Sequence, residues 1–68
     1  MIDKALLRYY AEKSKYSMSS LATELNMNPA TMFRKLNGTS DFTRHEMQKI
    51  KDLLHLSTQE FHNIFFAS

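Results

Sequence analysis

Three helix-start signals constrain this chain more than any other feature of its sequence. Asn28-Pro29 pairs a strong N-cap with a proline at the first helical position, where the missing N–H would have no helical partner anyway. Segments 43–46 and 57–60 read Thr-Arg-His-Glu and Ser-Thr-Gln-Glu, the capping-box pattern that satisfies two free backbone donors at once. One glycine, one proline and no valine make strands unfavourable. The sequence therefore predicts an all-α protein.

Two further helices are expected before these three. The first spans about residues 3–14 with Asp3 as its N-cap, and the second spans about 18–25 with Ser17 as its N-cap. The third helix ends at Asn37-Gly38, since both residues tolerate a left-handed helix stop. Apolar residues at helical spacing predict the inward positions: Ile2, Leu6, Tyr9 and Tyr10 with Leu7 flanking them, then Leu21, Ala22 and Leu25, then Met32 and Leu36, then Met47, Ile50 and Leu54, and finally Phe61, Ile64 and Phe65.

The length and composition limit the chain to one domain over residues 1–68 with a small core. The chain has no cysteine for a disulfide or a zinc site, and its three histidines, His45, His55 and His62, lack metal-ligand spacing. There is no glycine-rich phosphate loop and no nucleophile motif, so we expect no enzymatic activity, metal, cofactor or small-molecule substrate. Apolar runs are far shorter than the roughly 20 residues of a membrane helix, which predicts a cytoplasmic protein with no membrane partner.

Charge is unevenly distributed along the chain, although the net charge is only +2. Residues 1–38 carry six basic and three acidic side chains, whereas residues 52–68 carry only the acidic Asp52 and Glu60. A basic body with an acidic tail favours a polyanionic partner on one side of the molecule. Ordinary solvated surface charge is the alternative interpretation.

Residues 17–38 have the features of two short helices that meet across a tight turn. Such helices need a small residue where they touch, and Ala22 lies there. Asn26 falls in the turn, where positive φ is common and asparagine is the best tolerated residue after glycine. Met27 is expected to fill the space beneath the turn. These features predict a helix-turn-helix.

This segment resembles the helix-turn-helix of the Cro and repressor (XRE-type) family of phage regulators. The matching residues are the small Ala22, the turn residue Asn26, the plug Met27 and the closing Asn37-Gly38, and with the flanking helices the resemblance covers nearly the whole chain. Asn26 replaces the family's usual glycine. Lys35 replaces a buried aliphatic residue, so either Phe33 and Leu36 complete the inner face or Lys35 lays its methylene stem along the core. The resemblance implies a five-helix, lambda-repressor-like DNA-binding domain.

The resemblance also implies which residues contact DNA, because the second helix of the motif enters the major groove. Arg34 is the expected reader of guanine, through two hydrogen bonds, and Ala30 and Thr31 are expected near thymine methyl groups. Phosphate contacts are expected from Ser17, Asn37 and the loop 39–44. The complete expected DNA-binding set is Ser17, Asn28, Pro29, Ala30, Thr31, Arg34, Lys35, Asn37 and Arg44.

Two functions follow from the resemblance. The first is a phage Cro-like transcriptional regulator that binds double-stranded operator DNA, as a homodimer, in the cytoplasm of a bacterial host. The second is an anti-repressor that binds the partner phage repressor protein and masks its DNA-binding surface. Met18 and Phe66 are the expected interface residues, because Met18 replaces a polar DNA-contacting residue and Phe66 lies off the apolar face of the last helix.

Overall fold

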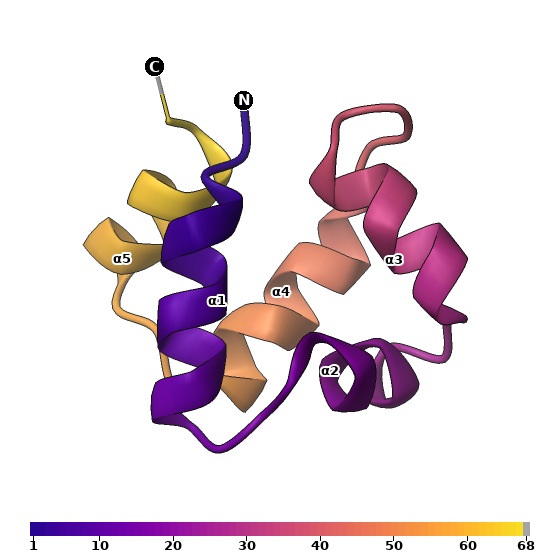
Figure 1. The fold of residues 1–68 in the computed structure, drawn as a ribbon. Coiled ribbons are helices and arrows are strands. Elements are labelled where there is room, and N and C mark those ends of the chain that lie inside the picture. The colour runs from indigo at the N-terminus through magenta and orange to yellow at the C-terminus, as the bar shows by residue number, and fades with distance from the viewer. Residues whose placement is uncertain (68) are drawn as a thin grey trace.

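Each helix of the structure, a computed structural model describing residues 1–67, begins directly after a capping side chain. The helices are α1 (Lys4–Lys13), α2 (Met18–Glu24), α3 (Pro29–Leu36), α4 (Arg44–Leu53) and α5 (Thr58–Phe65), and residues 1–67 contain no strand (Figure 1). The all-α prediction is confirmed. The N-caps are Asp3, Ser17, Asn28, Thr43 and Ser57, each of which accepts a hydrogen bond from a backbone N–H three residues later.

The expected capping boxes at Thr43 and Ser57 are both present. A third one, which the sequence analysis missed, starts α2: the Ser17 backbone N–H donates to Ser20 Oγ at 2.8 Å, and the Ser20 N–H donates to Ser17 Oγ at 3.0 Å. Serine here takes the place of the glutamate or glutamine of the usual pattern. A serine three residues after the N-cap does not mark a capping box in the sequence as clearly as a glutamate or glutamine does.

Four residues after helix ends have left-handed backbone conformations. Asn26 has φ 57° and Gly38 has φ 82°, as their residue types predict. Lys15, with φ 67°, and His55, with φ 53°, were not expected there. Lysine and histidine carry no strong preference for this conformation, so the sequence alone did not mark these two helix ends.

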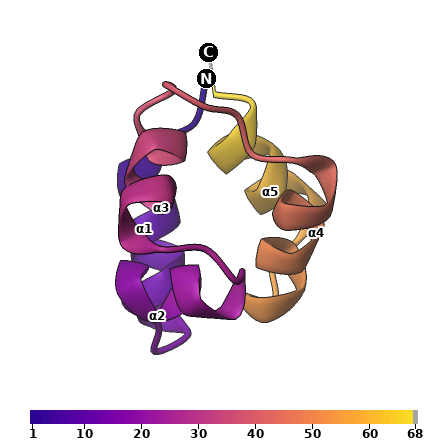
Figure 2. The ribbon, with the colours of Figure 1, turned by 90° about the vertical axis from the view of Figure 1, so that its right-hand side faces the viewer.

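The helices enclose one small core. In Figure 1, α1 lies against α5, α4 runs diagonally behind them, and α2 and α3 form the opposite side. Figure 2 shows the same arrangement edge-on, with α1, α2 and α3 on one side and α4 and α5 on the other. The two chain ends lie together, since the Asp3 N–H donates to the Ile64 carbonyl at 2.7 Å and the Ala67 N–H to the Met1 carbonyl at 3.0 Å.

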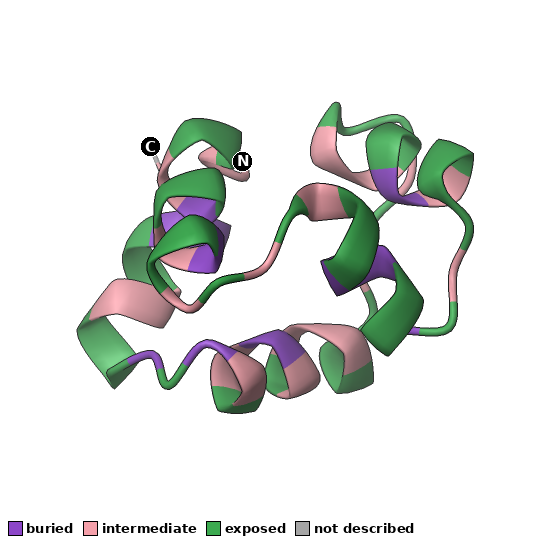
Figure 3. Ribbon diagram, turned by 60° about the horizontal axis from the view of Figure 1, so that its bottom comes forward, coloured by how far each residue is buried: buried purple, intermediate pink, exposed green. Residues whose placement is uncertain are grey.

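The buried residues face inward from all five helices (Figure 3). They are Leu7, Ala11, Leu21, Ala22, Leu25, Met32, Ile50, Leu54, Leu56, Ile64 and Phe65. Most of the predicted inward positions are thus confirmed, with Ile2, Leu6, Tyr10, Leu36, Met47 and Phe61 partly buried against this core.

The predicted inner face of α1 is wrong at two positions. Tyr9 is 57% exposed, whereas Leu7, expected beside the core, is fully buried. Leu7 and Ala11 lie one helical turn apart and together form the buried stripe of α1. The large residues at 6, 7, 9 and 10 are compatible with several helix rotations, and packing against α2 and α5 selects this one.

Candidate nucleic-acid interface

The connection between α2 and α3 is short and hydrogen-bonded. The Asn26 N–H donates to the Thr23 carbonyl and the Met27 N–H donates to the Ala22 carbonyl, both at 3.0 Å. Ala22 is 1% exposed, and Met27 is partly buried against the core. A side chain larger than alanine at position 22 would meet the packed interior. Ala22 and Met27 thus lie inward at this connection, and Asn26 has the positive φ expected of it.

The first turn of α3 presents Pro29 and Ala30, both exposed. Asn28 precedes them, and its Oδ1 accepts a hydrogen bond from the Thr31 N–H at 2.8 Å. This bond leaves the Asn28 side-chain amide group exposed for other contacts. Four of the expected DNA-binding residues, 28–31, therefore lie together at one end of α3.

Arg34 lies one turn further along α3 and is exposed. Its guanidinium donates a hydrogen bond to Thr31 Oγ1 at 3.3 Å. Thr31 thus orients Arg34 along the helix and leaves the remaining guanidinium N–H groups free to bind a ligand. The structure brings these two predicted residues into direct contact.

Lys35 does not share this exposed surface. Its side chain is only 12% exposed, and Nζ lies 2.6 Å from Glu46 Oε1 on α4 and 5.9 Å from the centre of the Phe42 ring. Its interpretation as an outward residue is therefore corrected, and the alternative with a buried stem is the one observed. Phe33 does not replace it in the core, because Phe33 is 65% exposed.

The Lys35–Glu46 ion pair joins α3 to the start of α4. Burial alone would raise the pKa of Glu46, but hydrogen bonds from Lys35 and from the Thr43 backbone outweigh it and hold that pKa below its ordinary value. The same carboxylate closes the α4 capping box, where the Thr43 N–H donates to it at 2.8 Å. One side chain on α4 thereby fixes both a helix start and the C-terminal half of α3.

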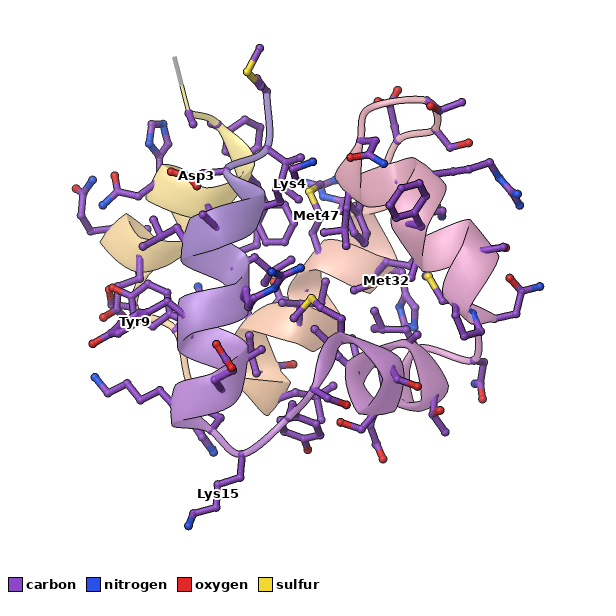
Figure 4. All side chains as sticks on the ribbon, in the orientation of Figure 1. Asp3, Lys4, Tyr9, Lys15, Met32 and Met47 are labelled. Atoms are coloured by element: carbon purple, nitrogen blue, oxygen red, sulfur yellow. The ribbon has the colours of Figure 1, made fainter. Side chains whose placement is uncertain are left out.

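Asn37 at the end of α3 is linked to the opposite end of the chain. Its Oδ1 accepts a hydrogen bond from Lys4 Nζ at 2.7 Å. Figure 4 shows Lys4 projecting from α1 toward α3. The sequence gives no sign that Lys4 belongs to the site, because 33 residues separate the two partners and only the packing of α1 brings them together.

The loop after α3 is attached to that helix, since the Thr39 and Ser40 N–H groups donate to the Arg34 carbonyl at 2.9 and 3.3 Å. Arg44, the first residue of α4, is exposed. Asp41 in the same loop is also exposed and adds a negative charge to the expected phosphate-binding segment. The hydroxyl of Ser17, also expected at phosphate, is occupied by the α2 capping box.

Phe33 is exposed, although it was one of two residues expected to complete the inner face of α3. It lies on α3 beside a hollow of about 160 Å³, whose lining includes Arg8 of α1, Met18 of α2 and Met32. The expected interface residue Met18 is itself half-buried and packs against the core. Met18 is thus less available than its position in the sequence suggested.

A second apolar region lies where the chain ends meet. Phe66 is 53% exposed and contacts His62 and Phe61, with ring centres 5.5 and 6.2 Å away. It borders a hollow of about 660 Å³ that also includes Met1 and Phe42. The expectation that Phe66 lies at the surface agrees with the structure.

Other kinds of site receive little support within residues 1–67. No group of three or more histidine, cysteine or acidic side chains in this part of the chain is arranged to hold a metal ion. None of the helices in the same range has both the length and the apolar character required to cross a bilayer. No protein-family model, curated protein or solved structure matches this chain.

Proposed function

We propose that α2 and α3 form a helix-turn-helix and that the protein is a Cro-like transcriptional regulator of a bacteriophage, which binds operator DNA in the host cytoplasm. The single observation that carries this proposal is the exposed side of α3. It presents Ala30, Arg34 and Asn37 in successive turns, and basic residues of α1 lie beside it. A helix of this kind fits the major groove of B-DNA.

In this proposal the residues have distinct tasks. Arg34, oriented by Thr31, donates two hydrogen bonds to the acceptors of one guanine. Lys4 and Arg44, both exposed, contact phosphates and contribute affinity that is independent of sequence. Lys35 holds α3 against α4 and reads no base. No cofactor or catalytic step is required.

Operator binding as a homodimer is part of the proposal, because a single recognition helix reads few base pairs. Two copies reading half-sites about one helical turn apart would overcome this limit. The apolar region around Phe66 is the surface we assign to self-association, since exposed aromatic clusters commonly mark interfaces.

The second candidate is an anti-repressor that binds a partner phage repressor. The same apolar region favours it: Met1 is 92% exposed and Phe66 is 53% exposed at the edge of a hollow of about 660 Å³. A protein partner with an apolar side chain of its own would cover this region. The two candidates differ in whether the exposed side of α3 binds a nucleic acid.

A mobility-shift assay distinguishes the candidates, using duplexes selected by the protein from a random DNA library. Arg34→Ala should weaken binding by about 1–3 kcal/mol and relax the preference at one base pair. Lys13→Ala is the matched control, because it removes the same charge from α1 next to Tyr10, on the side facing α5. If the wild-type protein selects no duplex at all, operator binding is rejected, and a stoichiometric complex with the repressor would support the second candidate.

A further inference from the structure

Phe33 occupies the exposed side of α3 together with the proposed base-reading residues. It follows Ala30 by three residues and precedes Asn37 by four, and these spacings place all three on one helix face. Arg34 is its immediate neighbour on the helix. The side chain of Phe33 is 65% exposed, compared with 2% for Met32.

Packing within the protein does not account for a phenylalanine at this position. Burying such a side chain fully is worth about 1.5–3 kcal/mol, and Phe33 obtains only a small part of this. Aromatic pairs join Phe42, Phe61, Phe65 and Phe66 to other rings, whereas within residues 1–67 no ring pairs with Phe33. An exposed aromatic residue with few partners is available to a ligand.

The charges around Phe33 indicate what kind of ligand fits. The adjoining hollow is lined by Arg8 of α1 and by no acidic side chain, and the exposed Arg34 follows Phe33 directly in α3. Lys4 adds a third basic side chain at the end of the same helix, where its Nζ donates a hydrogen bond to Asn37. An apolar ring within a basic surface complements a polyanion that also presents apolar groups.

We infer that Phe33 determines specificity by packing its ring against the C5-methyl group of a thymine in the major groove. The inference rests on the proposed function and adds to it a second base, a thymine, that α3 recognises. Thymine is the one DNA base with an apolar group at the major-groove edge, and phenylalanine is among the side chains suited to contact it. With Arg34 one residue further along the helix, α3 would read a thymine and a guanine close together.

The test removes only the methyl group from the DNA. Duplexes selected from a random library by the wild-type protein are resynthesised with each thymine replaced in turn by deoxyuridine. At one position the replacement should weaken wild-type binding about three- to fivefold, the value of one buried methyl group. Phe33→Ala should bind the thymine and deoxyuridine duplexes equally, while Tyr9→Ala, on the side of α1 away from α3 (Figure 4), should discriminate as the wild type does.

The outcomes separate this inference from the proposed function. If the wild-type protein binds its selected duplexes but Phe33→Ala shows the same pattern of deoxyuridine effects, the inference is wrong and the DNA-binding proposal stands. If the wild-type protein selects no duplex, both are wrong, and Phe33 is then available to a protein partner. A thermal melt of Phe33→Ala close to that of the wild type, expected from the exposure of Phe33, shows that lost discrimination is not unfolding.

Discussion

Helices α3 and α5 look alike in isolation but have different roles in the structure. Each has eight residues, begins at a capping side chain and carries or adjoins an exposed phenylalanine, Phe33 in α3 and Phe66 after α5. In α5 both Ile64 and Phe65 are buried, whereas in α3 only Met32 is. Helix α5 therefore contributes two buried side chains to the core and α3 contributes one, although four residues of each helix are exposed.

The surroundings of the two phenylalanines extend this difference. Phe66 contacts Phe61 and His62 of its own helix and follows on directly from the buried Phe65. Phe33 has basic residues as neighbours, among them Arg8 and Arg34. The exposure of an aromatic side chain indicates a binding role only when its neighbours are considered with it, and on that basis we assign α3 to nucleic acid and the end of α5 to a protein surface.

The largest expected effect comes from removing the anchor of α5. Ile64→Ala should lower the free energy of unfolding by about 2–5 kcal/mol, because the fully buried side chain would leave a cavity beside the junction of the two chain ends. Urea denaturation followed by circular dichroism measures this. The exposed neighbour Asn63→Ala is the control and should change stability by no more than about 0.5 kcal/mol. Equal effects would contradict the structural role of α5.

Lys35→Ala should have the next largest effect, lowering stability by about 1–3 kcal/mol. This loss of unfolding free energy lies between the losses expected for an exposed and for a fully buried ion pair, because both side chains are mostly covered and Glu46 would lose its partner. Thermal unfolding against the exposed Lys13→Ala control tests it. If Lys35→Ala instead changed the DNA sequence preference without lowering stability, Lys35 would be a residue that contacts a DNA base.

Phe66→Ser should leave the fold intact and act on association. Since Phe66 is half-exposed, we expect a stability loss of about 1 kcal/mol or less and a clear weakening of the homodimer. Analytical ultracentrifugation of the wild type and the variant over a range of concentrations measures the second effect. A wild-type protein that stays monomeric at high concentration would remove the dimer from the proposal.

The residues with left-handed backbone conformation that precede α3 and α5 offer a smaller test of the difference between these two helices. His55, ahead of α5, has φ 53°, a conformation that costs a non-glycine residue energy, so His55→Gly should raise stability by about 0.5–1 kcal/mol. Asn26, ahead of α3, tolerates its φ of 57°, and Asn26→Gly should change stability much less. Chemical denaturation of both variants gives the difference, and a larger gain at Asn26 would contradict this account.

The contribution of Glu60 to the pH dependence of stability should be the weakest of these effects, because this carboxylate lies at the surface. The hydrogen bond from the Ser57 backbone holds the pKa of Glu60 at the start of α5 below its ordinary value of about 4.3. A lowered folded-state pKa contributes stability that is present above the unfolded-state value and is lost as the pH falls through the folded-state one. Melts of Glu60→Gln should therefore show less acid sensitivity than the wild type below about pH 4.3.

Local chemistry made the helix starts predictable. Each of the five N-caps is a short polar side chain that bonds to a backbone N–H three residues away, so a few residues contain all the information needed. The left-handed Asn26 was predictable for the same reason. The rotation of α1 was not, because Leu7 and Tyr9 are both large and apolar and only packing against the other helices distinguishes them.

The candidate site shows the same division between sequence and tertiary structure. The sequence by itself determined that this chain is helical, where its helices begin and which residues, such as Ala30 and Arg34, belong to α3. Only the tertiary structure decided that Lys35 turns inward to Glu46, that Lys4 reaches Asn37 and that Phe33 stays exposed. Caps and turns depend on bonds within a few residues, whereas these three outcomes depend on how helices distant in the sequence pack together.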